Sequence, residues 1–174
     1  IEQFPLTSLS IGVVEADKGR FKNILEIDMN FIEKNNIKAI LLDIDNTMID
    51  TDNNILEGLE DWVEEAKKHG IKFCILSNTN KKKKAEKMSK KLEVPYIYFA
   101  KKPFKFGFNR AKKIVQENSE NIAVIGDQIL TDVLGANRSH MYSILVEPLA
   151  EKDIFVTRFN RLIERQILKK YKQK

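Results

Sequence analysis

Two aspartates, Asp43 and Asp45, stand one residue apart directly after an apolar run of the sequence. Carboxylates this close repel each other unless a cation binds between them. Phosphate transfer gives the pair a use. Asp43 can attack phosphorus to form an aspartyl-phosphate, and Asp45 can protonate the leaving oxygen and later activate water. Mg²⁺, which prefers oxygen ligands, would neutralise the phosphate charge. Taken alone, the pair is also typical of a turn or a capping site.

Another acidic pair follows a second apolar run, residues 121–125. Gly126 permits a tight turn, after which Asp127 would project where a second metal carboxylate is needed. Asp132 would be a further ligand or an outer partner that orients Asp127. The alternative is that Asp132 supplies the N-terminal charge of a helix.

Hydroxyl, amide and ammonium groups complete the candidate set. Thr47 would hold the first loop and phosphoryl oxygens, Ser77 would hydrogen-bond a phosphoryl oxygen, and Asn78 would hold its loop. Ser-Asn is otherwise a common helix N-cap. Lysine is a compact charge suited to phosphate. The residues alone do not distinguish Lys102 from Lys101, and a lone lysine is usually solvated.

Apolar runs and helical spacings alternate along the chain. The sequence predicts strands over residues 37–43, 71–76, 96–99, 121–125 and 143–146, and helices over residues 56–69, 81–92, 106–117, 132–138 and 153–171. This alternation indicates a parallel sheet covered on both faces. Ligands of such sheets bind at the carboxyl ends of the strands, which is where the polar residues above are placed.

Composition sets broad limits on the class of protein. The chain has 174 residues, of which 43% are hydrophobic and 32% charged, and it carries a net charge of +5. These values predict one globular domain drawn to phosphate-rich partners: nucleic acid, anionic lipid or a phosphorylated metabolite. Cys74, the one cysteine, is expected to be a buried thiol. The sequence shows neither a signal peptide nor a membrane span, so a cytoplasmic location is expected.

The order Asp-x-Asp-x-Thr, Ser, Lys and Gly-Asp-x₄-Asp resembles the haloacid dehalogenase-like (HAD) phosphatases over residues 37–148. The resemblance implies that Asp43 is the nucleophile, Asp45 the acid/base, and that Ser77 and Lys102 hold the phosphate. It also implies that Asp43, the backbone carbonyl of Asp45 and Asp127 bind Mg²⁺, with support from Asp132. With an aspartate at position 45, the chain resembles the phosphatase branch of the superfamily and not the dehalogenase branch.

A closer resemblance is to the bacterial YqeG-type subgroup, subfamily IIIA, which is similar to the mitochondrial phosphatidylglycerophosphate phosphatases. It is carried by Asp43-Ile-Asp-Asn-Thr, Ala100-Lys-Lys-Pro, Gly126-Asp-Gln-Ile-Leu-Thr-Asp, Asn137-Arg138 and Val146-Glu-Pro. Its Ala-x-Lys-Pro pattern selects Lys102 over Lys101. Met48 and Ala136 depart from the usual leucine and glycine, and neither touches the catalytic set.

The resemblance implies a Rossmann-like α/β fold with a five-stranded parallel sheet and helices on both faces. The whole chain, residues 1–174, is predicted to be one domain, with a core over residues 37–148. Residues 1–36 and 149–174 are predicted to be flanking helical segments. Only 30 residues separate Asp45 from Leu76, and 24 separate Ser77 from Lys102. Both stretches are occupied by predicted elements, so no cap domain is expected.

An open site favours a substrate whose bulk stays outside, and the resemblance implies phosphatidylglycerophosphate or a related lipid or macromolecule. A basic helix face at residues 81–91 and an amphipathic segment at residues 153–171 could meet an anionic membrane. Solvated or packed helices are the alternatives. Other functions remain open: a nucleic-acid or ribosome-associated binding module, and a small-metabolite phosphatase whose oligomer partner forms a lid.

Overall fold

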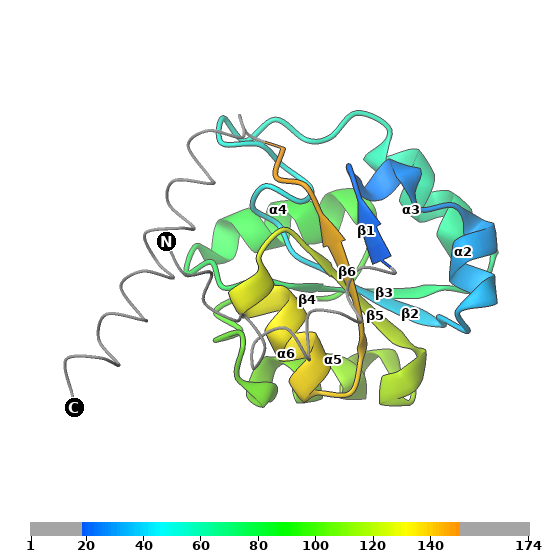
Figure 1. The fold of residues 1–174 in the computed structure, drawn as a ribbon. Coiled ribbons are helices and arrows are strands. Elements are labelled where there is room, and N and C mark those ends of the chain that lie inside the picture. Colours follow the sequence, from blue (N-terminus) through cyan, green and yellow to red (C-terminus); the bar gives the residue numbers. More distant parts are fainter. Residues whose placement is uncertain (1–18, 150–174) are drawn as a thin grey trace, which may run out of the picture.

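A parallel β-sheet organises the chain (Figure 1). The structure is a computed structural model that describes residues 19–149. Within them the strands are β1 (Arg20–Phe21), β2 (Ala39–Leu42), β3 (Lys72–Leu76), β4 (Tyr96–Ile97), β5 (Ile122–Gly126) and β6 (Tyr142–Val146). Their spatial order is β1-β6-β5-β2-β3-β4, and all neighbours are parallel. The predicted α/β class is confirmed.

The sheet has one strand more than the five that the sequence predicts. The additional strand is β1, which lies at the edge of the sheet and pairs with β6. A strand of two residues is too short to show an alternating pattern, and it falls where a helical segment is predicted. Each of the other five strands begins and ends within two residues of its predicted range.

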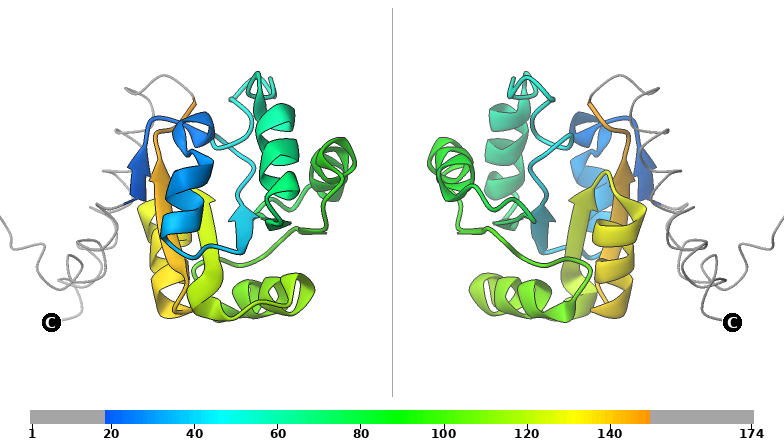
Figure 2. Two further views of the ribbon diagram at one scale, coloured as in Figure 1. Left: turned by 90° about the vertical axis from the view of Figure 1, so that its right-hand side faces the viewer. Right: turned by 90° about the vertical axis from the view of Figure 1, so that its left-hand side faces the viewer.

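Helices cover both faces of the sheet (Figures 1 and 2). On one face lie α2 (Met29–Lys34), α3 (Leu59–Lys68) and α4 (Lys82–Leu92), and on the other lie α5 (Lys105–Val115) and α6 (Leu134–Arg138). In β2, Ile40 and Leu42 join the core that contains α3 and α4, whereas Ala39 and Leu41 join the core that contains α5. Successive strand residues point to opposite faces, so a strand that is apolar throughout is buried on both.

The predicted helices of the middle of the chain are present, with shifted boundaries. The helix predicted at residue 56 begins at Leu59, because the preceding loop folds back through isolated bridges of Ile49 with Asp45 and Ile55. The predicted helix 132–138 is a π-helix, η4 (Ile129–Val133), followed by α6. Short 3₁₀ turns, η2 (Ile24–Glu26) and η3 (Ser119–Asn121), complete these elements. The predicted helix 153–171 lies outside the described residues.

Cys74 has the buried environment that the sequence predicts. It lies in β3 with no exposed surface. Burial raises the pKa of its thiol to about 12, so the reactive thiolate is scarce at neutral pH. Cys74 is a structural residue and does not belong to the site.

The carboxyl ends of the parallel strands form one edge of the sheet, called here the carboxyl edge. In the part of the chain that the structure describes, this edge is open. Between β2 and β3 there are a loop and α3, and between β3 and β4 there is α4. No further domain interrupts the sheet within residues 19–149.

Gly126 provides a prediction on stability. A Cβ atom at this position would lie 2.2 Å from the carboxyl carbon of Asp132. We expect Gly126→Ala to displace Asp132 and to lower the free energy of unfolding by about 1–3 kcal/mol, as measured by urea unfolding. An unchanged unfolding free energy would contradict this close packing.

Candidate active site

Four loops at the carboxyl edge bring most of the predicted site residues together. Asp43, Ser77 and Asp127 each follow directly after a strand, namely β2, β3 and β5. A cavity of about 230 Å³ opens there. It is lined by Asp43, Asp45, Ser77, Asn78, Thr79, Lys102, Gln128 and Thr131. The parallel sheet thus assembles groups that are up to 88 residues apart in the sequence.

Lys102 joins two of the acidic residues. Its Nζ donates to Asp43 Oδ1 at 2.9 Å and to Asp132 Oδ1 at 2.5 Å. Burial alone would lower the pKa of Lys102, but the carboxylates of Asp132 and Asp43 raise it above its ordinary value. The ammonium is therefore charged. Lys101 is exposed, with its Nζ 5.2 Å from the centre of the Phe99 ring, so the structure places Lys102, not Lys101, among the carboxylates.

Asn78 fixes the backbone of Lys102. Its Oδ1 accepts from the Lys102 N–H at 2.7 Å, and its Nδ2 donates to the Lys102 carbonyl at 3.0 Å. These bonds give Asn78 the loop-holding role, while its contact with phosphate stays a prediction. Ser77 is buried, and its Oγ accepts from the Thr79 N–H at 3.1 Å. Within residues 19–149 the Ser77 hydroxyl donates to no acceptor, so its proton can reach a phosphoryl oxygen.

Three carboxylates form a group that fits a divalent cation. Asp43, Asp127 and Asp132 each offer an oxygen, and these oxygens lie within 4.8 Å of one another. Burial raises the pKa of Asp43 to about 7 despite the adjacent Lys102 ammonium. Burial and then the charges of Asp43 and Asp132 raise the pKa of Asp127 to about 8. When ionised, the three carboxylates exceed the one ammonium by two negative charges, which an oxygen-binding divalent cation would balance.

The hydrogen bonds separate the roles of Asp127 and Asp132. Asp127 Oδ2 is buried and has no hydrogen-bond partner among the described residues, while its Oδ1 accepts from Thr47 Oγ1 at 3.4 Å. Both oxygens of Asp132 are engaged, one by Lys102 and one by the Gln128 N–H at 3.2 Å. This pattern favours Asp127 as a direct ligand and Asp132 as the residue that holds Lys102. Thr47 orients Asp127 and does not line the cavity.

Asp45 stands apart from the carboxylate group. Its side chain is 43% exposed and pairs with the Nζ of Lys84, in the first turn of α4. Its place at the cavity suits proton exchange with a leaving group. Lys84 is a site residue that the sequence motifs do not single out, although it belongs to the basic run that follows the Ser77 loop. Gln128, Thr79 and Thr131 are likewise lining residues without a sequence motif of their own.

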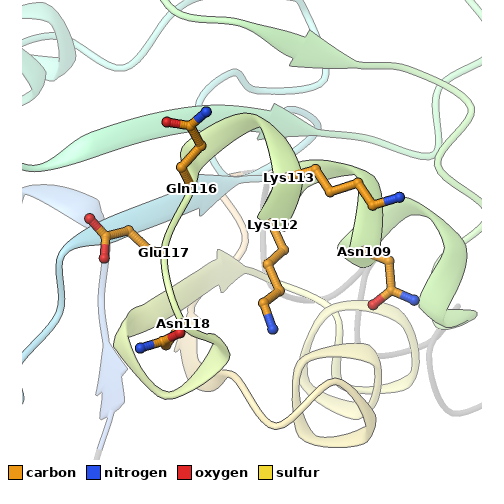
Figure 3. Close-up of a pocket in the computed structure, with 6 residues that line it drawn as sticks. All are labelled: Asn109, Lys112, Lys113, Gln116, Glu117 and Asn118. Carbon is orange, nitrogen blue, oxygen red and sulfur yellow. The ribbon is translucent and has the colours of Figure 1, made fainter.

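A larger cavity of about 640 Å³ lies at the opposite edge of the sheet (Figure 3). It lies beside the C-terminal end of α5 and the turn before β5. Its lining residues are Asn109, Lys112, Lys113, Gln116, Glu117 and Asn118. Glu117 is engaged by Lys72 at 3.0 Å. None of the predicted site residues lines this cavity, so size alone does not identify the reactive site.

Comparison with known protein sequences gives two matches that cover most of the chain. A family model described as mitochondrial PGP phosphatase matches residues 17–149. "Probable phosphatase YqeG" of Bacillus subtilis (strain 168) is 46% identical over 154 residues, which are 88% of this chain and 89% of the relative.

Solved structures share the fold at low sequence identity. The cobalt-bound deoxy-D-mannose-octulosonate 8-phosphate phosphatase of Haemophilus influenzae is 17% identical, with a TM-score of 0.55 over 71% of this chain and 75% of its own. An uncharacterized protein of Corynebacterium glutamicum is 19% identical, also with a TM-score of 0.55, over 70% of this chain and 91% of its own. These likenesses support the same α/β architecture.

Proposed function

The chain belongs to the mitochondrial PGP phosphatase family and is a phosphatase of the HAD superfamily; from this premise we propose that it hydrolyses a phosphate monoester through an aspartyl-phosphate on Asp43. The observation that carries the proposal is the buried Asp43 carboxylate beside the Lys102 ammonium, at an open strand edge. Nucleophile and phosphate-binding charge are thus side by side.

The reaction can be written with the chain's own residues. An Asp43 carboxylate oxygen attacks phosphorus while the bond from phosphorus to the leaving oxygen breaks, and Asp45 gives that oxygen a proton. Asp45 then takes a proton from a water that attacks phosphorus, which releases phosphate and restores Asp43. Lys102 and the Ser77 hydroxyl would hold phosphoryl oxygens throughout and would screen their charge.

Asp43, Asp127 and the backbone carbonyl of Asp45 are the proposed Mg²⁺ ligands, with Asp132 in support. The observation that favours a cation there is the buried Asp127 Oδ2, which has no hydrogen-bond partner in the described part of the chain. When bound, the ion would supply charge neutralisation for the phosphoryl group. The Haemophilus influenzae phosphatase of similar fold is a cobalt-bound form, which supports a divalent ion without selecting magnesium.

The raised pKa values predict a pH-dependent effect of Mg²⁺ on stability. In metal-free protein, Asp43 and Asp127 hold protons up to about pH 7 and 8, whereas their reference pKa is 3.8. Their stabilising contribution is complete below about pH 4 and is lost as the pH rises through 7 to 8. We expect saturating Mg²⁺ to raise Tm by about 5 °C more at about pH 8.5 than at about pH 5.5.

Thermal unfolding at the two pH values, with EDTA or with Mg²⁺, checks this prediction. Asp127→Asn is expected to remove most of the Mg²⁺-induced shift. Equal shifts at both pH values in the unaltered protein would contradict a cation bound by these carboxylates.

The proposed substrate is phosphatidylglycerophosphate or another large phosphorylated molecule at an anionic membrane. Within residues 19–149 no helix has the length and apolar character needed to cross a bilayer. The loop that carries Lys102 and the first turn of α5 nevertheless expose three aromatic side chains: Phe99 at 53%, Phe104 at 62% and Phe106 at 60%. Aromatic rings beside lysines suit the interfacial region of an anionic bilayer. These residues support peripheral binding with the site facing the lipid.

Phosphate release tests the proposal. We expect Mg²⁺-dependent release from p-nitrophenyl phosphate and faster release from phosphatidylglycerophosphate in vesicles. A preference for soluble sugar or nucleotide phosphates would favour the small-metabolite alternative. Absence of release from a broad panel, together with salt-dependent RNA binding that Asp43→Asn leaves intact, would contradict the proposal and favour the nucleic-acid module.

A further inference from the structure

A groove lies beside the candidate active site, between α4 and the loop that follows Asp45. Its volume is about 370 Å³, and it is lined by Ile49, Asn53, Ile55, Lys81, Lys83, Lys84, Lys87 and Met88. Lys84 connects the two cavities, because it lines the groove and its Nζ pairs with Asp45, which lines the active-site cavity. The Lys84–Asp45 ion pair therefore lies at the boundary between the two cavities, and the groove adjoins the site on the Asp45 side.

The groove combines an apolar part with uncompensated positive charge. Ile49, Ile55 and Met88 supply the apolar side chains. Within residues 19–149, Lys83 and Lys87 form no ion pair with a carboxylate, in contrast to Lys82, which pairs with Glu86 on the same helix.

This arrangement of charges is unfavourable for the isolated helix. Lys83 and Lys87 are four residues apart, so they are neighbours on the helix surface and repel each other. The first turn of α4 holds lysines and no acidic residue, although the helix dipole disfavours cations there. A bound anion would relieve both effects, whereas a solvated face gains nothing from clustering lysines in a groove.

The proposed chemistry fixes which part of a substrate reaches the groove. Asp45 must protonate the leaving oxygen, so the leaving group has to lie on the Asp45 side of the phosphorus. That side leads to Lys84 and the groove. Resting on the proposed function, we propose that this groove is a leaving-group subsite that binds a second anionic phosphate group through Lys83, Lys87 and Lys84.

Lys84 links occupancy of the subsite to the chemistry. In the structure its ammonium is engaged by Asp45. A second anionic group in the groove competes with the Asp45 carboxylate for the Lys84 ammonium. A substrate with one phosphate and a neutral leaving group lacks this competitor.

Binding of phosphonates, whose carbon–phosphorus bond this reaction does not break, tests the subsite without turnover. The full chain is titrated in Mg²⁺ by calorimetry with propylphosphonate and with propane-1,3-diyl bisphosphonate. We expect the bisphosphonate to bind about tenfold more tightly, and Lys83→Gln/Lys87→Gln to abolish the difference. The control is Lys68→Gln/Lys90→Gln, which makes the same change of charge at exposed lysines outside the groove and should keep the difference.

Equal affinities for the two phosphonates, or a preference that survives in Lys83→Gln/Lys87→Gln, would overturn the subsite. Because no bond is cleaved, this result is independent of whether the chain is an active phosphatase.

A kinetic comparison then shows which kind of molecule supplies the second anionic group. It measures kcat/KM for short-chain phosphatidylglycerophosphate and for propane-1,3-diyl bisphosphate. If Lys83→Gln/Lys87→Gln lowers kcat/KM more for the lipid, the subsite binds a lipid phosphodiester. If it lowers kcat/KM more for the soluble compound, the subsite binds a free phosphate.

Discussion

Replacing Asp43 with asparagine is expected to lower kcat for phosphate release by about 10⁴-fold or more, because the attacking oxygen becomes a weakly nucleophilic amide. The substitution hardly changes the size of the side chain. Asparagine can still accept the hydrogen bond that Lys102 donates to Asp43 at 2.9 Å, so the fold should persist. Steady-state release of phosphate in saturating Mg²⁺ measures the loss.

The matched control is Asp52→Asn. Asp52 lies in the same loop and is exposed, and it does not line the candidate active-site cavity. We expect Asp52→Asn to retain activity within about twofold, as is usual for exposed positions. An Asp43→Asn protein that is folded and retains most of its activity would show that another group attacks phosphorus.

Lys102→Met is expected to impair both activity and stability. Its ammonium is buried between Asp43 and Asp132, and removal leaves these carboxylates without their cation. Loss of one member of a buried ion pair costs about 3–5 kcal/mol. Loss of a group that stabilises transition-state charge lowers kcat by about 10²–10³-fold. Urea unfolding of metal-free protein and phosphate release in Mg²⁺ measure the two effects separately.

Lys101→Met is the matched control for Lys102. Lys101 is the adjacent lysine, is exposed, and stacks over Phe99. We expect it to change the free energy of unfolding by less than about 0.5 kcal/mol and to leave hydrolysis of p-nitrophenyl phosphate near its original rate. If the two variants behaved alike, the central position of Lys102 would have no energetic consequence.

The fold was largely predictable because its strands are buried on both faces. A strand such as β2, with four fully buried residues, produces an apolar run that needs no neighbour to be recognised. The strand β1 has two residues, one exposed and one half-buried, and its pairing depends on β6, which is more than 120 residues away in the sequence. Such an edge strand is set by tertiary contact, so local pattern does not reveal it.

The candidate site was predictable to the extent that its residues follow strands directly. Asp43, Ser77 and Asp127 do so, and the topology alone brings them together. The partners of these residues depend on helix placement: Lys84 reaches Asp45 only because α4 packs beside the β2 loop. The distinction between Asp127 and Asp132 likewise depends on which oxygens already have partners, and spacing cannot supply that.

Trapping the covalent intermediate tests the central claim most directly. The protein is mixed with substrate and Mg²⁺, quenched in acid, and treated with borohydride, which reduces an acyl phosphate to an alcohol and leaves free carboxylates unchanged. Peptide mass spectrometry is then expected to find Asp43 converted to homoserine, and only when substrate is present. Active protein in which Asp43 is unmodified, or in which a different residue carries the reduction, would contradict an aspartyl-phosphate at Asp43.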